Sequence, residues 1–347
     1  MALALLSLAC RRSPIARLAL ACRRSLVALL LLACGRPPAT TDPAPATADP
    51  ALAAADSEAA LPRFSGAHAR ERLAALLELP RALGDPRRAA SIDALADLLT
   101  ATGATSVARL EHTGADPWTD TRFAMTTLVG RLRPDAPRQF LLASHFDVRP
   151  WAESDPDPAR REHAIPGAND GSSGVAVLLE LAPLLLAQLP ADVGFSLILF
   201  DGEELGRPGA GPYCAGSRAL ADALVARDPA FTSVRAASFG IVLDMVGDRD
   251  LQLLQEPASR RAAPALVDAI WSMGQVAGYP QFVAEPMPEP LIDDHVPLAR
   301  AGVPSILIID YSYLPWHTHA DGLEQIAAGS LEAVGETLRR ALLERWR

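Results

Sequence analysis

One stretch decides the fold: Phe195-Ser196-Leu197-Ile198-Leu199-Phe200-Asp201-Gly202-Glu203-Glu204. Residues 195–200 form a short, almost continuously apolar run, which is typical of a strand that is buried on both faces. Similar runs lie at 122–132, 139–144, 239–245 and 303–309. Helical patterns surround them at 67–83, 89–102, 173–188, 217–226, 262–277 and 322–346. This alternation predicts an α/β fold with a mixed, mostly parallel central sheet sandwiched by helices.

Polar side chains follow these apolar runs at the points where the predicted strands end. The set comprises His145, Asp147, Asp201, Glu203, Glu204, Asp244 and, after a short loop, His317. Asp170 lies in a glycine-rich segment, 167–174, at the start of a predicted helix. Because open α/β sheets bind ligands outside the carboxyl ends of their strands, we expect these distant segments to converge on one crevice.

Each of these motifs is weak when it stands alone. A lone histidine is usually a hydrogen-bonded surface residue, and Glu203-Glu204 would usually be a solvated pair. Asp170 would serve equally as a turn residue or in a helix cap. Together, however, two imidazoles and three carboxylates form the kind of ligand set that Zn²⁺ takes in catalytic sites. A carboxylate beside a ligand that cannot itself reach the metal is the expected general base.

The order of these residues resembles the M28 family of zinc peptidases over nearly all of residues 64–346. The resemblance rests on His145-x-Asp147, Asp170, Glu203-Glu204, Asp244, Asp294-His295 and His317. More narrowly, five segments resemble the glutaminyl-peptide cyclotransferase branch of this family: 199–204, 216–218, 293–297, 302–304 and 316–318. The resemblance implies the fold of the zinc aminopeptidases, in agreement with the α/β pattern above.

The resemblance also implies a role for each matching position. Asp170, Glu204 and His317 would hold the zinc, and Glu203 would shuttle protons. Asp244 and Asp293 match acidic residues that hydrogen-bond in the cyclase site, and Trp316 matches an aromatic residue that stacks on the substrate. In two-metal aminopeptidases of the family, His145 and Asp244 carry a second zinc and Asp170 bridges the two ions. We expect one zinc, although the ligands for a second are present.

Two catalytic functions share these residues. A cyclase would convert the N-terminal glutamine of a peptide or protein to pyroglutamate, with Glu203 carrying a proton to the departing ammonia. An M28 aminopeptidase would instead use Glu203 to activate a water that hydrolyses the first peptide bond. A silent surface-binding protein would have lost ligands or the base, and none is lost here. One position departs from the cyclase pattern, because Leu307 stands where animal cyclases carry a histidine.

Composition excludes several other classes of function. The chain has 347 residues and a formal net charge of −9, and an acidic surface repels phosphate backbones and anionic lipid headgroups. A nucleic acid is therefore not an expected partner. All 32 basic residues are arginine, so Schiff-base chemistry and a P-loop lysine are excluded.

The first residues carry targeting signals. Residues 1–34 read as a signal peptide with a lipobox, in which Cys34 would become the lipidated N-terminus of an exported bacterial membrane-anchored lipoprotein. An ordinary cleaved signal and a single-pass anchor at 15–34 are the alternatives. Residues 35–62, rich in Pro and Ala, read as a disordered tether, and 63–347 as one catalytic domain. Beyond Cys34 the only cysteine is Cys214, which excludes an internal disulfide and predicts a small buried apolar residue.

Overall fold

The computed structural model describes residues 61–347 except residue 212. The predicted signal peptide lies outside the described residues, as does the predicted tether apart from its last two residues. The described residues belong to one compact unit that runs to Arg347. None of the helices in this part of the chain combines the length and the hydropathy that crossing a membrane would require.

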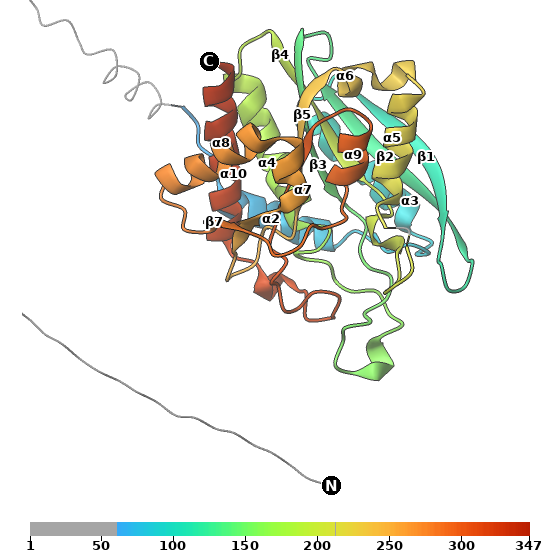
Figure 1. Ribbon diagram of the computed structural model, residues 1–347. Coiled ribbons are helices and arrows are strands. Elements are labelled where there is room, and N and C mark those ends of the chain that lie inside the picture. The colour runs from blue at the N-terminus through green and yellow to red at the C-terminus, as the bar shows by residue number, and fades with distance from the viewer. Residues whose placement is uncertain (1–60, 212) are drawn as a thin grey trace, which may run out of the picture. The chain divides into compact units, whose positions relative to one another are not determined.

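The centre of the described part is a six-stranded mixed sheet with the strand order β1-β2-β4-β3-β5-β8 (Figure 1). Its strands are β1 (Ser106–Ala115), β2 (Arg122–Leu132), β3 (Arg138–His145), β4 (Val193–Phe200), β5 (Ala237–Asp244) and β8 (Ser305–Ile309). The four strands β4, β3, β5 and β8 are parallel, whereas β2 is antiparallel to both of its neighbours. A separate parallel pair is formed by β6 (Leu253–Gln255) and β7 (Phe282–Pro286).

Helices cover both faces of the large sheet. The α-helices are α2 (Gly66–Leu77), α3 (Arg88–Ala101), α4 (Ser173–Gln188), α5 (Ala215–Val225), α6 (Thr232–Arg235), α7 (Pro257–Ala262), α8 (Pro264–Val276), α9 (His295–Arg300) and α10 (Ala328–Trp346). Short 3-10 helices are η1 (Pro158–Arg160), η2 (Glu203–Leu205), η3 (Pro229–Phe231) and η4 (Leu323–Gln325). In Figure 1, α4 and α10 lie on one side of the strands and α5 lies on the other.

The alternation of side chains along the strands divides the core into two layers. In β4, Leu197 and Leu199 pack in the core that contains side chains of α2, α4 and α10. Ile198 and Phe200 point to the opposite face and pack in the core that contains side chains of α5 and α9. Because the side chains of a strand alternate between its faces, an apolar run that buries both faces requires helices on both sides. The predicted helix sandwich is therefore confirmed.

The predicted elements differ from the structure where local chemistry ends them early. Strand β2 and helix α4 have the predicted bounds, but the first helix ends at Leu77 rather than at 83, and Pro80 follows soon after. The helix predicted at 262–277 is α8, which begins at Pro264 because the chain breaks at Ala263, and the preceding helix α7 was not predicted. Strand β1 was missed, since it lies at the sheet edge, pairs only with β2 and has no fully buried residue.

Candidate metal and catalytic site

A pocket of about 320 Å³ lies outside the carboxyl ends of the parallel strands. It is reached by segments that follow β3, β4, β5 and β8, as the strand order predicts. The residues that line it are Asp170, Glu203, Glu204, Tyr213, Asp244, Met245, Pro290, Leu291, Ile292, Asp293, Ile309, Tyr311, Trp316 and His317. His145 is 2% exposed and contacts two of these carboxylates directly.

The loop before α4 holds Asp170 in a fixed position. The carboxylate of Asp321 accepts hydrogen bonds from the backbone N–H groups of Asn169 (2.8 Å) and Asp170 (3.2 Å). Tyr313 donates its hydroxyl to the same carboxylate at 2.7 Å. The side-chain oxygen of Asn169 accepts from the N–H of Gly247, which ties the loop to the segment after β5. These contacts fix the direction of the Asp170 side chain.

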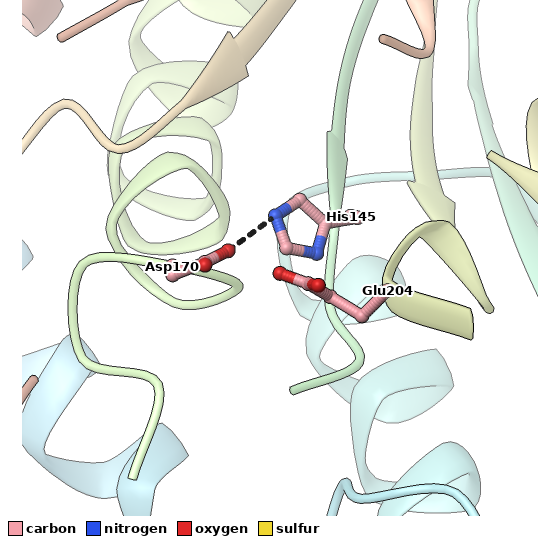
Figure 2. Close-up of side chains that lie close together, drawn as sticks. All are labelled: His145, Asp170 and Glu204. Atoms are coloured by element: carbon pink, nitrogen blue, oxygen red, sulfur yellow. Dashed lines mark ion pairs between the residues drawn. The ribbon is translucent and has the colours of Figure 1, made fainter. Parts of the chain in front are cut away.

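Asp170 faces two buried histidines. Its Oδ1 lies 3.2 Å from Nε2 of His145, and its Oδ2 lies 3.8 Å from Nε2 of His317. The Nε2 atom of His145 is also 3.0 Å from Oδ1 of Asp244. Figure 2 shows His145, Asp170 and Glu204 converging from three separate segments. Asp170 thus lies between one group formed by His145 and Asp244 and a second group formed by Glu204 and His317.

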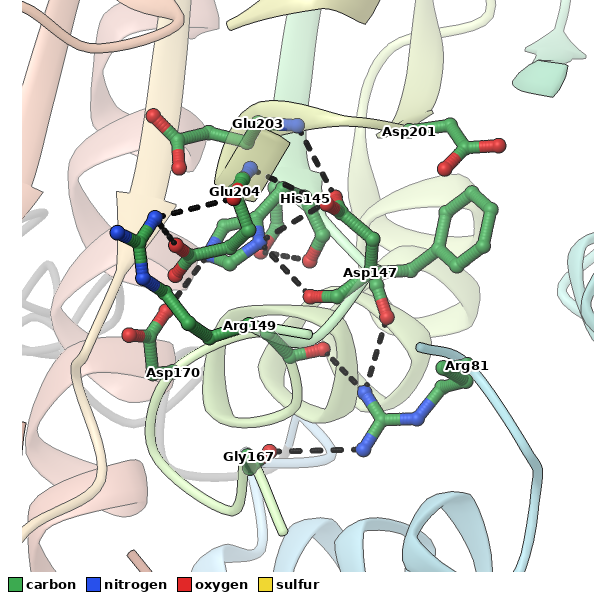
Figure 3. A network of polar contacts seen from close by, with 12 residues as sticks. Arg81, His145, Asp147, Arg149, Gly167, Asp170, Asp201, Glu203 and Glu204 are labelled. Atoms are coloured by element: carbon green, nitrogen blue, oxygen red, sulfur yellow. Dashed lines mark hydrogen bonds and ion pairs between the residues drawn. The ribbon is translucent and has the colours of Figure 1, made fainter. Parts of the chain in front are cut away.

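The consecutive residues Glu203 and Glu204 lie in η2, directly after β4. Gly202 permits the turn into η2, because its φ of 76° lies in the left-handed region that favours glycine. The carboxylate of Asp147 then accepts hydrogen bonds from the N–H groups of Glu203 (3.2 Å) and Glu204 (3.1 Å). In Figure 3 a dashed line joins the Glu204 carboxylate to Arg149, whereas no dashed line joins the Glu203 carboxylate to Arg149. The two adjacent glutamates therefore have different surroundings within the site.

A chain of charged contacts supports Glu204 and His317. Nη1 of Arg149 donates to Oε2 of Glu204 at 3.1 Å and to its backbone oxygen at 3.0 Å. The same guanidinium donates two hydrogen bonds to Glu153. Glu153 Oε1 lies 2.8 Å from Nδ1 of His317, and Nε2 of that ring lies 3.4 Å from Oε2 of Glu204. The arrangement leaves Nε2 of His317 facing the two carboxylates.

The side chain of Glu203 has a different environment. Its carboxyl group is buried, and the thiol of Cys214 donates to its Oε1 at 3.2 Å. Burial raises its pKa well above the ordinary value, and the charges of Glu204, Asp293 and Asp294 raise the pKa further. A raised pKa is the direction of shift that favours a carboxyl group acting first as a general base and later as an acid.

Burial and like charges also perturb the groups around Asp170. Burial and the charge of Glu204 raise the pKa of Asp170 well above its ordinary value. Burial opposes protonation of His317, but Glu204 and Glu153 outweigh it and raise its pKa to about 9. Burial likewise opposes protonation of His145, yet its acidic neighbours, Asp244 first, raise its pKa well above the ordinary value. Several buried carboxyl groups thus lie beside the two imidazoles. A bound cation would stabilise this arrangement.

The residues present fit a divalent cation. Ligand atoms of His145, Asp170 and Glu204 lie within 4.8 Å of one another, and all three side chains are buried. Oδ2 of Asp170 is buried without a hydrogen-bond partner, which is costly for a carboxylate unless a cation meets it. Nitrogen and carboxylate oxygen donors are a typical set for zinc in a catalytic site. This close group contains His145, whereas the sequence predicted His317, which lies 3.4 and 3.8 Å from the same two carboxylates.

The structure brings every predicted site residue to this pocket or into contact with it. The predicted ligands, the predicted base, Asp244, Asp293 and Trp316 all line the pocket, and the ring of Trp316 stacks on that of His317 with centroids 3.6 Å apart. Sequence reasoning missed three supporting residues, Glu153, Arg149 and Asp321. No local pattern marks them, because each acts on a residue far away along the chain.

The chain is similar in sequence and in structure to known proteins. Residues 127–342, more than half of the chain, match peptidase family M28. Among curated proteins, the glutaminyl-peptide cyclotransferase of Gloydius blomhoffii is 25% identical over 63% of this chain and 65% of its own length. The chain therefore spans just under two thirds of the length of that relative.

Solved structures match over more of the chain. The glutaminyl cyclase of Porphyromonas gingivalis is 33% identical with a TM-score of 0.72, and the match covers 81% of this chain and 99% of the other. A Zn-dependent exopeptidase from Parabacteroides distasonis is 30% identical with a TM-score of 0.75, covering 82% of this chain and 100% of the other. A cyclase and an exopeptidase thus share this fold.

Proposed function

Because this chain belongs to peptidase family M28, we propose that it is a zinc-dependent glutaminyl-peptide cyclotransferase. It would convert the N-terminal glutamine of a peptide or protein to pyroglutamate and release ammonia. The observation that carries the proposal is the single pocket in which Glu203, Asp293 and Trp316 surround the carboxylates and imidazole of the candidate metal site. The glutaminyl cyclases among the related structures support the same reaction.

The residues that would hold the zinc are Asp170, Glu204 and His317, with His145 close beside them. When bound, zinc supplies a Lewis acid that polarises the γ-carbonyl of the glutamine and stabilises the negative charge that develops on its oxygen. Asp244 and Asp293 also line the pocket, where their carboxyl oxygens can accept hydrogen bonds from the α-amino group of the substrate.

Glu203 performs the proton transfers in this proposal. It accepts a proton as the α-amino nitrogen attacks the side-chain carbonyl carbon, and a carbon–nitrogen bond closes the five-membered ring. The bond from that carbon to the amide nitrogen then breaks, and Glu203 returns the proton to the leaving ammonia. No water is consumed, because nucleophile and electrophile belong to the same residue, and proximity supplies much of the acceleration.

Asp293 and Trp316 would position the glutamine. Burial and the charge of Asp244 raise the pKa of Asp293 to about 7, so its carboxyl group can accept from or donate to the amine near neutral pH. Trp316 is fixed by its stack on His317 and presents its ring to the pocket. A flat aromatic face suits the flat amide of the glutamine side chain.

One experiment separates the cyclase from its competitors. The purified protein is incubated with two peptides that differ only in beginning with Gln or with Leu. A cyclase releases ammonia from the first peptide, whose mass falls by one ammonia, and leaves the second intact. Release of free leucine from the second peptide, without cyclisation of the first, would contradict the proposal.

An aminopeptidase is the second candidate, and one observation favours it. Oδ1 of Asp170 lies near His145, which also contacts Asp244, whereas Oδ2 of Asp170 lies near His317, and a carboxylate that bridges two metal ions would use its two oxygens in this way. In that case Glu203 would activate a water that hydrolyses the first peptide bond. The Leu-initiated peptide tests this candidate directly.

We further propose that the enzyme works outside the cytoplasm as a lipoprotein anchored through Cys34. The proposal rests on the charged, apolar and small-residue pattern of 1–34. Cells that express the protein are fed a labelled fatty acid, and we expect label on the protein and none after Cys34→Ala. Equal labelling of the variant would exclude this anchor.

A further inference from the structure

The segment 287–295 carries a large part of the pocket wall without belonging to a strand or a helix until its last residue. It contributes Pro290, Leu291, Ile292 and Asp293 to the lining. It also carries Asp294 and leads into α9. A segment without its own ladder of hydrogen bonds depends on contacts from elsewhere for its position. The position of the Asp293 side chain therefore depends on the contacts that hold this segment in place.

Two consecutive residues, Gln255 and Glu256, hold the segment at three points. The N–H of Met287 donates to the backbone oxygen of Gln255 at 2.9 Å. The N–H of Leu291 donates to Oε1 of Glu256 at 3.1 Å. Nε2 of His295 lies 3.2 Å from Oε2 of Glu256. The last two contacts lie two residues before and two residues after Asp293, so one carboxylate fixes both sides of it.

Glu256 is itself rigidly held. Its side chain is fully buried, and it caps α7 by accepting from the N–H groups of Ala258 (2.8 Å) and Ser259 (2.5 Å). Burial opposes its ionisation, but the contact with His295 and these backbone donors lower its pKa to about 2. Four hydrogen-bond donors and the nearby imidazole of His295 restrict this carboxylate, so it is a well-defined reference point for the segment.

The same network reaches the central sheet at Leu307, the position where the cyclase pattern has a histidine. Ser259 donates its hydroxyl to Oε2 of Glu256 at 2.7 Å. Its oxygen accepts from the backbone N–H of Leu307 in β8 at 2.9 Å. The position of the segment is thus tied to the sheet through Glu256 and Ser259, without an imidazole at 307.

We propose that Glu256 is a positioning residue for Asp293: it fixes the segment 287–295 against β8 and so sets the place of the carboxyl group that orients the substrate amine. The inference rests on the proposed function for the role of Asp293. Glu256 is not among the residues that line the pocket, so we do not expect it to contact the substrate. Its removal is expected to slow turnover without removing a ligand or the base.

A double-mutant cycle tests the proposal against a merely structural role. Glu256→Gln removes the charge but keeps one carbonyl acceptor, and we expect kcat to fall about tenfold to a hundredfold, while zinc content and KM change less than about twofold. In an Asp293→Asn background the same substitution should lower kcat by less than about twofold, because the residue through which it acts is already lost. Equal losses in both backgrounds would overturn the proposal.

Two further variants keep the test decisive. Glu289→Gln is the matched control, because Glu289 is an exposed carboxylate in the same segment, and it should leave kcat unchanged. His295→Gln removes one contact and leaves the cap of α7 in place, so it replaces Glu256→Gln in the cycle if that variant does not fold. A loss of kcat for Glu289→Gln as large as for Glu256→Gln would count against a specific anchor.

A last measurement needs no turnover and so separates this proposal from the proposed function. Hydrogen exchange of the peptide that covers 287–295 is compared between the parent protein and Glu256→Gln. Faster exchange in this segment, with α4 and α10 unchanged, is expected from the loss of the anchor. Unchanged exchange in the segment would refute the anchor even if the protein forms neither pyroglutamate nor free leucine. If the segment shows the expected faster exchange but the protein forms neither pyroglutamate nor free leucine, only the proposed function is refuted.

Discussion

Glu153 sets the orientation of His317, because its Oε1 atom lies 2.8 Å from Nδ1 of the imidazole. The contact leaves Nε2 of the ring to face Asp170 and Glu204. His317 needs this support, since its φ of 58° lies in a region that non-glycine residues adopt rarely. A carboxylate that accepts from the far nitrogen of a metal-binding histidine is a common device for fixing its tautomer and raising its basicity.

We predict that Glu153→Gln weakens zinc binding about tenfold to a hundredfold. An amide accepts more weakly from Nδ1 than a carboxylate does, so the ring is less basic and less well oriented. Zinc affinity is measured by competition with a chelator. Glu162→Gln is the control, because Glu162 is an exposed carboxylate in the same part of the chain and should bind zinc as the parent does. Equal affinity of Glu153→Gln and the control would refute the role of Glu153.

Glu203→Gln should abolish turnover and keep the zinc. The substitution removes the only function that we assign to this side chain, which is proton transfer, while its neighbour remains free to bind the metal. Glu204→Gln is the matched comparison, and it should lose zinc and activity together. Metal analysis and ammonia release on both variants check the pair. A Glu203→Gln protein that keeps full activity would remove Glu203 from the mechanism.

Much of this site was predictable, and the reason is the sheet. Once the apolar run 195–200 is recognised as a buried parallel strand, Glu203 and Glu204 must lie at its carboxyl end beside the residues that follow the neighbouring strands. The motifs then identify His145, Asp170 and His317 together. The supporting residues were not predictable in this way, because the Arg149–Glu204 and Glu256–His295 contacts each join side chains dozens of positions apart. Nothing in a local pattern specifies such a pairing.

The stability of the metal-free protein should fall as the pH rises from 6 to 9. Burial and Asp244 raise the pKa of Asp293 from 3.8 to about 7. Despite its burial, His317 has its pKa raised to about 9 by Glu204 and Glu153. Each group binds its proton more tightly in the folded chain than in the unfolded one. The stability they contribute is therefore present at low pH and is lost as the pH rises through the folded values.

We expect the melting temperature of the chelator-treated protein to drop by on the order of 5 °C over this range. Saturating zinc should flatten or reverse the trend, because the cation replaces the lost protons and its ligands must be deprotonated to bind it. Thermal melts at three pH values, with and without zinc, provide the measurement. A metal-free protein that becomes more stable between pH 6 and pH 9 would contradict the assigned shifts.

The number of zinc ions should be one, and the two histidines beside Asp170 allow a test. If Asp170, Glu204 and His317 hold a single ion, His317→Gln loses it, whereas His145→Gln keeps about one zinc per chain, because His145 then serves as a hydrogen-bonding partner of Asp244 and Asp170. If a second ion lies between His145 and Asp244, the parent protein contains two, and His145→Gln contains half as much zinc as the parent. Elemental analysis after dialysis measures the zinc per chain and distinguishes the cases. A bridging Asp170 would require both histidines to be ligands. Two ions in the parent would favour the aminopeptidase over the cyclase, since hydrolysis needs an activated water and cyclisation does not.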